Sequence, residues 1–327
     1  MSARLSELTA STQRLALVGL AKNTGKTVAL GTLLRELEAA GRRVGVTSVG
    51  RDGEERDVID SRIEKPRIEL AGGSLVATTD SLLRSSGIPH ELLEQTDVRT
   101  PLGRVLVARL RGAGAIEVAG PSAAEQVRTV SDAMLAHGAE MVLIDGAIDR
   151  RAASSPDVAD ALVVSTGAVL SEELSEVVRR TAEAVELVRL PPAALDGAPL
   201  TLEPQFTLTA EAEQVADLLD NAPNARQLIV PGALPDRFLD SLAKVVHRRR
   251  RELVLVVRDP TKVFLLERGL AWYERQGVRM QAAHPIALAA ITVNPLAPQS
   301  HRFDSARLRE ALEASIADVP ILDVLAK

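Results

Sequence analysis

The chain has no cysteine, and this absence removes several classes of protein from consideration. Disulfide scaffolds, iron–sulfur proteins and thiolate zinc sites all need cysteine sulfur. Only five histidines occur in 327 residues, and none is spaced like the paired ligands of an H-x-x-x-H zinc helix. The lack of cysteine also fits a protein of the cytoplasm, which is where we expect this chain to act.

Aromatic residues and positive charge are also scarce. Aromatics make up 2% of the chain and the formal net charge is −5, so neither base-stacking platforms nor a broad basic surface is expected. The local exception is 248–251, four consecutive arginines, interpreted as a solvated helix end with an anion-binding patch as the alternative. We therefore expect no nucleic-acid partner.

Long hydrophobic runs are absent as well. No run approaches the roughly 20 apolar residues that span a bilayer, and the first fourteen residues are mostly polar, without a signal-peptide core. We expect no membrane partner. The hydrophobic content of 46% and charged content of 25% are those of an ordinary globular protein.

Short apolar runs alternate with amphipathic stretches along most of the chain. The runs predict strands at 14–18, 44–48, 75–78, 105–110, 115–119, 140–145, 159–165, 227–230, 252–257 and 287–293. The stretches predict helices at 26–40, 122–137, 172–186, 209–220, 235–247, 260–276 and 304–317. This alternation is typical of an α/β protein with a mainly parallel, doubly wound sheet and helices on both faces.

One segment between a predicted strand and a predicted helix carries most of the functional information. It reads Gly19-Leu-Ala-Lys-Asn-Thr-Gly25-Lys26-Thr27, the context in which a phosphate-binding loop occurs. Glycines let backbone N–H groups approach phosphate oxygens, and a helix N-terminus adds donors and positive partial charge. Lys26 would reach the β- and γ-phosphates, and the Thr27 hydroxyl would bind Mg²⁺. The nucleotide-binding residues predicted from this loop are Gly19, Lys22, Asn23, Thr24, Gly25, Lys26, Thr27 and Val28.

The loop departs from the usual spacing by one residue. The pattern G-x-x-x-x-G-K-[ST] places its first glycine at position 20, where this chain has Leu20, and the glycine stands at 19. The alternative interpretation is a Gly-Lys-Thr tripeptide at an ordinary helix start. The succession of strand, loop, Gly-Lys-Thr and helix favours the phosphate loop.

An acidic residue at the end of a neighbouring strand would complete such a site. Asp145 follows the apolar run 141–144 and is predicted to hold Mg²⁺, with a turn-forming aspartate as the alternative. Arg150 follows closely and is a candidate for stabilising charge on a transferring phosphate, or else a surface residue. Lys26, Asp145 and Arg150 are thus the predicted catalytic set.

The acidic loop after predicted strand 44–48 is a second source of metal ligands. Loops at the carboxyl ends of parallel strands line the ligand crevice of a doubly wound sheet. Asp52, Glu54 or Glu55 would bind Mg²⁺ or orient water, with a solvated acidic loop as the alternative. Lys65 and 165–167 are weaker candidates on the same topological ground, and Arg51 is a candidate for binding an acidic substrate if the protein is a ligase.

The residues around the loop resemble a known class of proteins. Lys22-Asn-Thr-Gly-Lys-Thr27 resembles the loop of the adaptor proteins of molybdopterin-guanine dinucleotide biosynthesis, and Gly25 to Arg35 is similar to the loop and first helix of dethiobiotin synthetase. Both belong to the signal-recognition, MinD and BioD class of P-loop NTPases. The Pro-rich stretch 190–208 is the expected boundary within the chain. It would separate a nucleotide-binding domain at 1–190 from a C-terminal α/β part at 191–327, which is separate or continues the same sheet.

The end of the chain extends this resemblance. Asn294 follows an apolar run, as does the base-contacting asparagine of the synthetase, which implies that Asn294 contacts the base; the alternative is a strand-ending asparagine. Two features depart from the class. Ala21 stands where the MinD-type signature lysine would be, and no N-K-x-D guanine motif is present. ATP is therefore the expected nucleotide, with GTP not excluded, and Mg²⁺ its metal.

Over its first half the chain resembles the reactivase subunit of lysine 5,6-aminomutase. The similar segments are 19–27, 47–54, 145–150 and 165–170. This resemblance implies an NTPase switch or chaperone that hydrolyses ATP for a cobalamin-dependent aminomutase, its protein partner. The alternatives are an ATP-dependent ligase or kinase like dethiobiotin synthetase, and a nucleotide-binding adaptor without turnover. Switches of this class often dimerise across the loop, which leaves a homodimer open.

Overall fold

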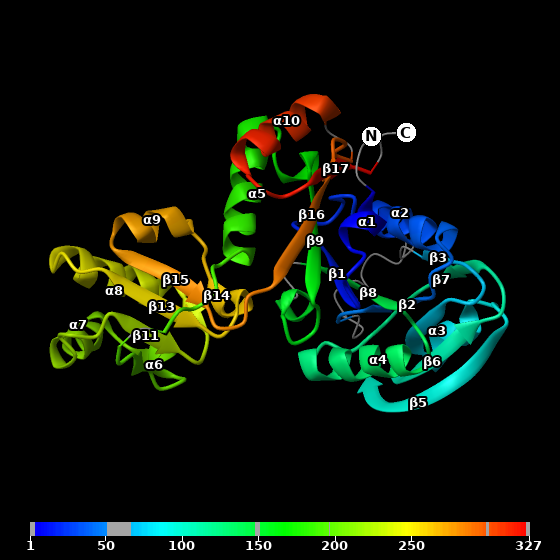
Figure 1. Cartoon of the computed structure of the whole chain (residues 1–327), viewed down its shortest axis with the longest axis horizontal. Coiled ribbons are helices and arrows are strands. Elements are labelled where there is room, and N and C mark those ends of the chain that lie inside the picture. The colour runs from blue at the N-terminus through cyan, green and yellow to red at the C-terminus, as the bar shows by residue number, and fades with distance from the viewer. Residues whose placement is uncertain (1–3, 51–66, 148–150, 196, 299–300, 325–327) are drawn as a thin grey trace. The chain divides into compact units, whose positions relative to one another are not determined.

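The computed structural model describes residues 4–50, 67–147, 151–195, 197–298 and 301–324 (Figure 1). The chain divides into two compact units, of which the first comprises Met1–Thr181 and Ala287–Lys327 and the second comprises Ala182–Ile286. The second unit is thus an insertion in the sequence of the first. The boundary expected after residue 190 does not separate two consecutive halves, because the chain returns to the first unit at residue 287.

The first unit is built on a nine-stranded sheet with the order β17-β16-β9-β1-β8-β2-β4-β6-β5. The pairs from β17 across to β4 are all parallel, whereas β6 pairs antiparallel with both β4 and β5. The predicted α/β architecture with a mainly parallel sheet is therefore confirmed. The strands are β1 (Arg14–Gly19), β2 (Val44–Ser48), β4 (Leu75–Thr79), β5 (His90–Thr100), β6 (Gly103–Leu110), β8 (Met141–Ala147), β9 (Ala161–Gly167), β16 (Ala287–Asn294) and β17 (Ile321–Asp323).

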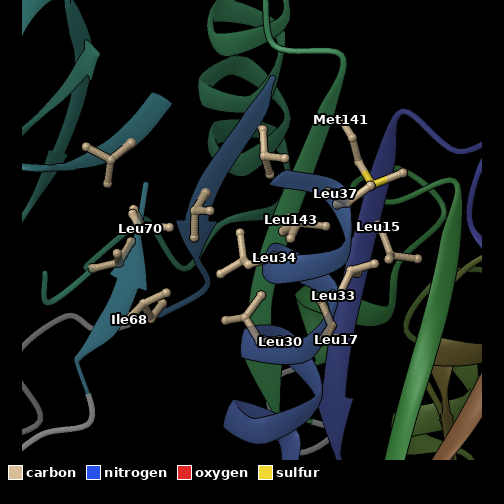
Figure 2. Close-up of a cluster of buried hydrophobic side chains, with 14 of the residues drawn as sticks. Leu15, Leu17, Leu30, Leu33, Leu34, Leu37, Ile68, Leu70, Met141 and Leu143 are labelled. Carbon is tan, nitrogen blue, oxygen red and sulfur yellow. The ribbon is translucent and has the colours of Figure 1, made fainter. Parts of the chain in front are cut away.

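Helices cover both faces of this sheet. The leucines of α2 (Lys26–Ala39) point toward β1 and β8 and share a buried core with Leu15, Leu17 and Leu143 (Figure 2). On the other face lies α4 (Ala124–Ala136), whose Met134 would contact a side chain added at Gly45. Since successive residues of a strand point to opposite faces, Gly45 and the α2-facing Val46 place the two helices on opposite sides.

The remaining elements of the first unit are short or peripheral. A two-stranded antiparallel sheet joins β3 to β7, and two 3₁₀ turns follow β8 and β9. These elements are α1 (Leu5–Leu8), β3 (Ile68–Leu70), α3 (Asp80–Ser85), β7 (Gly114–Ile116), η2 (Arg151–Ser154), η3 (Ala168–Leu170), α5 (Leu174–Val188), whose second half belongs to the other unit, and α10 (Ser305–Ser315).

Strand β5 was not predicted from the sequence. Its residues, HELLEQTDVRT, are largely polar and exposed, because β5 lies at the edge of the sheet and pairs only with β6. An edge strand needs few apolar residues, so the periodicity that reveals buried strands is weak there. The strand predicted at 115–119 is also shorter than expected, since β7 ends at Ile116.

The second unit has its own four-stranded parallel sheet, with the order β10-β11-β13-β15, and a separate buried core. A second small sheet pairs β12 with β14 in parallel. The elements are β10 (Leu200–Thr201), α6 (Phe206–Thr209), α7 (Ala212–Asn221), β11 (Gln227–Val230), β12 (Leu234–Pro235), α8 (Asp236–Arg248), β13 (Leu253–Val257), η4 (Pro260–Lys262), β14 (Val263–Phe264), α9 (Leu270–Arg275) and β15 (Val278–Ala282).

The helix predicted at 260–276 is wrong. Asp259 is buried, and its Oδ1 accepts the backbone N–H of Thr261 at 2.9 Å, which forms a short turn instead of a helix start. Val263 then pairs with Leu234, so this stretch becomes β14. Of the predicted range, only Leu270–Arg275 is α-helical, and Pro260–Lys262 forms a single 3₁₀ turn. The strand pairing across the second unit overrides the local helical periodicity.

The Tyr273 hydroxyl and two arginines form hydrogen bonds and ion pairs that hold the helices of the second unit. The buried Tyr273 hydroxyl donates to Asp236 at 2.6 Å and to Asp240 at 3.1 Å, and burial together with these carboxylates raises its pKa, so the donor stays protonated. In the arginine run, Arg249 pairs with Asp220 at 2.8 Å, and Arg251 donates to the carbonyl of Ala225 at 2.7 Å. These two arginines stabilise the fold, in line with the helix-end interpretation.

Across the described ranges, no helix combines the length and the apolar character that crossing a membrane requires.

Candidate functional site

The predicted phosphate loop lies at the carboxyl edge of the large sheet, between β1 and α2. The strands that follow β1 in the chain, β2 and β4, lie on one side of it, and the later strands β9, β16 and β17 lie on the other. The winding of the sheet thus reverses direction at β1. In open α/β sheets such a reversal leaves a crevice beyond the carboxyl ends of the strands, where ligands bind.

Two residues with left-handed backbone give the loop its shape. Asn23 has φ 65° and Gly25 has φ 88°, on either side of the buried Thr24. The Thr24 hydroxyl donates to the carbonyl of Ala21 at 3.0 Å, which folds the loop back on itself. A side chain at Gly19 would come within 2.6 Å of that hydroxyl. This close approach explains why the first glycine stands at 19.

Leu20 occupies the position at which the usual pattern has glycine, and it continues the sheet. Its N–H donates to the carbonyl of Ser165 on β9 at 3.0 Å. The loop therefore leaves the strand one residue later than Gly19, with its backbone already fixed against β9. The departure in spacing is accommodated by this strand contact and by the folded-back Thr24.

The first turn of α2 is open to an anion. Gly25 is the N-cap and provides no side-chain hydrogen bond, and the first turn has no acidic residue. The first N–H groups of a helix have no partner within the helix, and the aligned peptide dipoles make this end positive. The side chains around it are exposed, namely those of Lys22, Asn23, Thr27 and Val28.

An ion pair links the start of α2 to the neighbouring strand. The Lys26 Nζ lies 2.7 Å from the Asp145 Oδ1, and both side chains are largely buried, with 22% and 16% of their areas exposed. The sheet register fixes this meeting, because Asp145 on β8 stands opposite Leu17 on β1 and opposite Ser48 on β2. β8 is thus the direct parallel neighbour of the loop's own strand.

The ion pair is chemically suited to exchange partners. Each charge of the pair satisfies the other, which avoids leaving either unpaired in a partly buried place. A phosphate chain with Mg²⁺ offers both a new partner, since Lys26 can turn to phosphate oxygens and Asp145 to the metal. Magnesium is commonly held by one or two carboxylates together with substrate phosphates.

The residues present fit that mode of metal binding. Thr27 follows Lys26 at the helix start and its side chain is exposed, so its hydroxyl is accessible at that end of α2. Within the part of the chain that the structure describes, no group of three or more histidine, aspartate and glutamate side chains could form a cage around a metal.

Asn294 reaches the loop from the last part of the chain. It ends β16, which pairs with β9, and it stands opposite Gly167 in that pairing. Its Nδ2 donates to the carbonyl of Asn23 at 2.9 Å, and its Cβ lies 3.0 Å from the position of a Cβ added at Gly25. The structure thus brings Asn294 to the phosphate loop. The base contact implied by the resemblance stays a prediction.

Ser48, which stands opposite Asp145, and Gly120, which contacts Ser48, were not predicted from the sequence. The Ser48 hydroxyl donates to the carbonyl of Val118 and accepts from the Gly120 N–H, both at 3.1 Å. A side chain at Gly120 would come within 2.0 Å of the Ser48 carbonyl. The available signal was Gly120-Pro121 after an apolar run, which indicates a chain reversal and not a continuing strand.

Several predicted site residues lie outside the described residues. These are Arg51, Asp52, Glu54, Glu55, Lys65 and Arg150. The weaker candidates on β9 are described, and their hydroxyls are bonded within the fold. Ser165 bonds to Thr292 at 2.8 Å, and Thr166 bonds to Thr181 at 2.7 Å.

Comparison with known proteins adds little. No model of a known protein family matches the chain, and no curated protein matches it. One solved structure, described as pNOB8 ParA bound to nonspecific DNA, is similar over 65% of this chain and 76% of that one, at 12% identity and a TM-score of 0.27. A TM-score this low does not establish a shared fold.

The loop geometry predicts that replacing two glycines of this region by alanine changes the free energy of unfolding in opposite directions. Gly25→Ala should lower the free energy of unfolding by about 1–3 kcal/mol, because alanine is strained at φ 88° and its Cβ would crowd Asn294. Gly31 lies inside α2 with no atom within 4 Å of an added Cβ, so Gly31→Ala should raise that free energy by about 0.5–1 kcal/mol. Denaturant unfolding followed by circular dichroism measures both. Equal effects would contradict the described loop conformation.

Proposed function

We propose that the chain binds a nucleoside triphosphate with Mg²⁺ at the loop 19–27 and hydrolyses it. The observation that carries the proposal is the ion pair between Lys26 and Asp145, which stands at the open N-terminus of α2. The left-handed Asn23 and Gly25 support it, because they shape a short loop of backbone donors ahead of that helix. We propose ATP over GTP because the chain lacks the N-K-x-D guanine motif.

The residues divide the work of binding between backbone and side chains. Backbone N–H groups of 23–27 hold the phosphate oxygens, helped by the positive end of α2. Lys26 leaves Asp145 and places its ammonium group on the β- and γ-phosphates. Thr27 and Asp145 hold the metal, with Asp52 and Glu54 as proposed additional ligands. Mg²⁺ supplies positive charge that neutralises the phosphate oxygens during transfer.

Hydrolysis in this arrangement depends on positioning and on charge. Phosphoryl transfer needs the attacking water, the γ-phosphorus and the leaving oxygen in line, while negative charge is spread over the equatorial oxygens. Lys26 stabilises that charge from the loop side, and Arg150 is proposed to do so from the segment after β8. The water oxygen bonds to the γ-phosphorus as the bond to the β,γ-bridging oxygen breaks, ADP leaves, and the proton of the water passes to a phosphate oxygen. The rate comes mainly from fixed geometry and electrostatics.

Replacement of Lys26 tests the proposal. Lys26→Ala should abolish ATP hydrolysis, because the variant loses the ammonium group that binds the β- and γ-phosphates. The measurement is phosphate release with Mg²⁺, together with a circular dichroism spectrum to show that the fold survives. Lys244→Ala, which removes an exposed lysine of α8, is the matched control and should hydrolyse ATP at the wild-type rate. Normal activity in folded Lys26→Ala would sink the proposal.

The dependence of ATP hydrolysis on the Mg²⁺ concentration tests the role of Asp145. Asp145→Asn should raise the Mg²⁺ concentration for half-maximal hydrolysis by at least about tenfold, because an amide binds Mg²⁺ less strongly than a carboxylate does. Hydrolysis is measured across a Mg²⁺ titration, with Asp97→Asn on the exposed face of β5 as control. An unchanged titration would remove Asp145 from the metal site.

The finer role we propose is that of an ATP-driven switch for a cobalamin-dependent aminomutase. Its support is the resemblance of 19–27, 47–54, 145–150 and 165–170 to the reactivase subunit. A switch hydrolyses slowly alone and faster with its partner, so adding the aminomutase should stimulate ATP turnover, and Lys26→Ala should remove the stimulation. Turnover that ignores the aminomutase but responds to a small carboxylic substrate would favour the ligase alternative instead.

A further inference from the structure

We propose that Asn294 is a positioning residue that braces the phosphate loop from the C-terminal strand β16, acting on phosphate binding and not on the base. The inference rests on the proposed function, because it assigns Asn294 a part in the same site. It differs from the role that the resemblance implies, in which the asparagine touches the nucleotide base. The hydrogen bonds of the Asn294 side-chain amide support the bracing role, and a ligand without a base tests it against base contact.

Both ends of the Asn294 amide are already engaged within the protein. The Nδ2 donates to the carbonyl of Asn23 at 2.9 Å, a contact between residues 271 positions apart. The Oδ1 accepts the backbone N–H of Leu296 at 3.0 Å, which turns the chain just after β16. Bracing uses both of these hydrogen bonds as they stand, whereas a base contact would use the second Nδ2 hydrogen or the second Oδ1 lone pair.

The contact with Asn23 falls on a left-handed turn of the loop. Asn23 is exposed and has φ 65°, a conformation that asparagine tolerates better than most residues other than glycine. A peptide group is planar and trans, so a fixed Asn23 carbonyl also fixes the direction of the Thr24 N–H on its other side. Asn294 therefore orients one of the loop's donors through the backbone.

Steric contacts place Asn294 firmly against the loop. Its Cβ would crowd a side chain at Gly25, where an added Cβ would lie 3.0 Å away. On its other side, an added Cβ at Gly167 would come within 2.2 Å of the Asn294 carbonyl. Glycines at both positions let the end of β16 approach the loop and the end of β9 at once. The backbone of Gly25 and that of Gly167 thus pack against Asn294 on two sides.

A ligand without a base separates bracing from base recognition. Magnesium tripolyphosphate offers the phosphate chain alone, so its affinity depends on the loop and not on any base contact. If Asn294 braces the loop, Asn294→Ala should weaken non-hydrolysable ATP and GTP analogues and tripolyphosphate to the same extent. The loss of one hydrogen bond corresponds to about a fivefold to tenfold rise in each dissociation constant.

The experiment combines calorimetry with a readout that needs no ligand. The three ligands are titrated with Mg²⁺ into the full chain, its Asn294→Ala variant and the control Asn224→Ala, which changes an exposed asparagine of the second unit. Limited trypsin cleavage after Lys22 then reports the loop without ligand. It should become about fivefold to tenfold faster in Asn294→Ala. Cleavage after Arg35 of α2 should not change, whereas general destabilisation would raise both.

Each outcome bears on the proposal. Equal weakening of all three ligands with faster cleavage after Lys22 supports it. Weakening of the nucleotides but not of tripolyphosphate overturns it in favour of base contact, and unchanged binding overturns it outright. If Asn294→Ala does not fold, Asn294→Asp keeps the acceptor for Leu296 and removes the donor. Faster cleavage of that variant after Lys22 then supports bracing, and an unchanged rate overturns it. If the wild-type chain binds none of the ligands, the proposed function itself fails.

Discussion

The parallel pairing of β1 with β8 on one side and with β9 on the other is the constraint on which the candidate site depends. The register with β8 sets Asp145 level with Leu17, so its carboxylate stands beside the start of α2 and meets Lys26. The register with β9 lets Leu20 continue the sheet through the carbonyl of Ser165. Between these two fixed points the chain must turn, and Asn23 and Gly25 provide the left-handed backbone for that turn.

The site is completed by a strand from the far end of the sequence. The second unit, residues 182–286, interrupts the first, and β16 then pairs with β9 and brings Asn294 to the loop. Residues 1–190 alone would leave the edge of β9 unpaired and the carbonyl of Asn23 without this donor. The two stretches of the first unit therefore form one sheet and, in our proposal, one nucleotide site.

The parts of the fold that the sequence predicts well are those specified by local pattern. The strand before the loop, the helix after it and the strand ending in Asp145 each have a strong apolar period and lie within two residues of their expected bounds. The helix predicted at 260–276 fails because Val263 pairs with Leu234, a partner distant in sequence. The polar edge strand β5 fails because its position requires no apolar period.

In the candidate site too, features set by local sequence pattern were predictable and features set by long-range pairing were not. Lys26 and Asp145 could be predicted because a motif and a strand end mark them, and their meeting follows from the order of parallel strands. The contact of Asn294 with Asn23 and the approach of Gly120 to Ser48 could not, since each depends on how distant segments return to the sheet edge. Sequence patterns give the residue types at such places, while the pairing of strands decides what they touch.

The most direct test of the central claim is calorimetric binding of non-hydrolysable ATP and GTP analogues to the full chain, with and without Mg²⁺. We expect a micromolar dissociation constant that depends on Mg²⁺, because Asp145 would hold the metal once Lys26 turns to phosphate. Absence of binding by either nucleotide would contradict the claim and would leave the loop as a structural turn between β1 and α2.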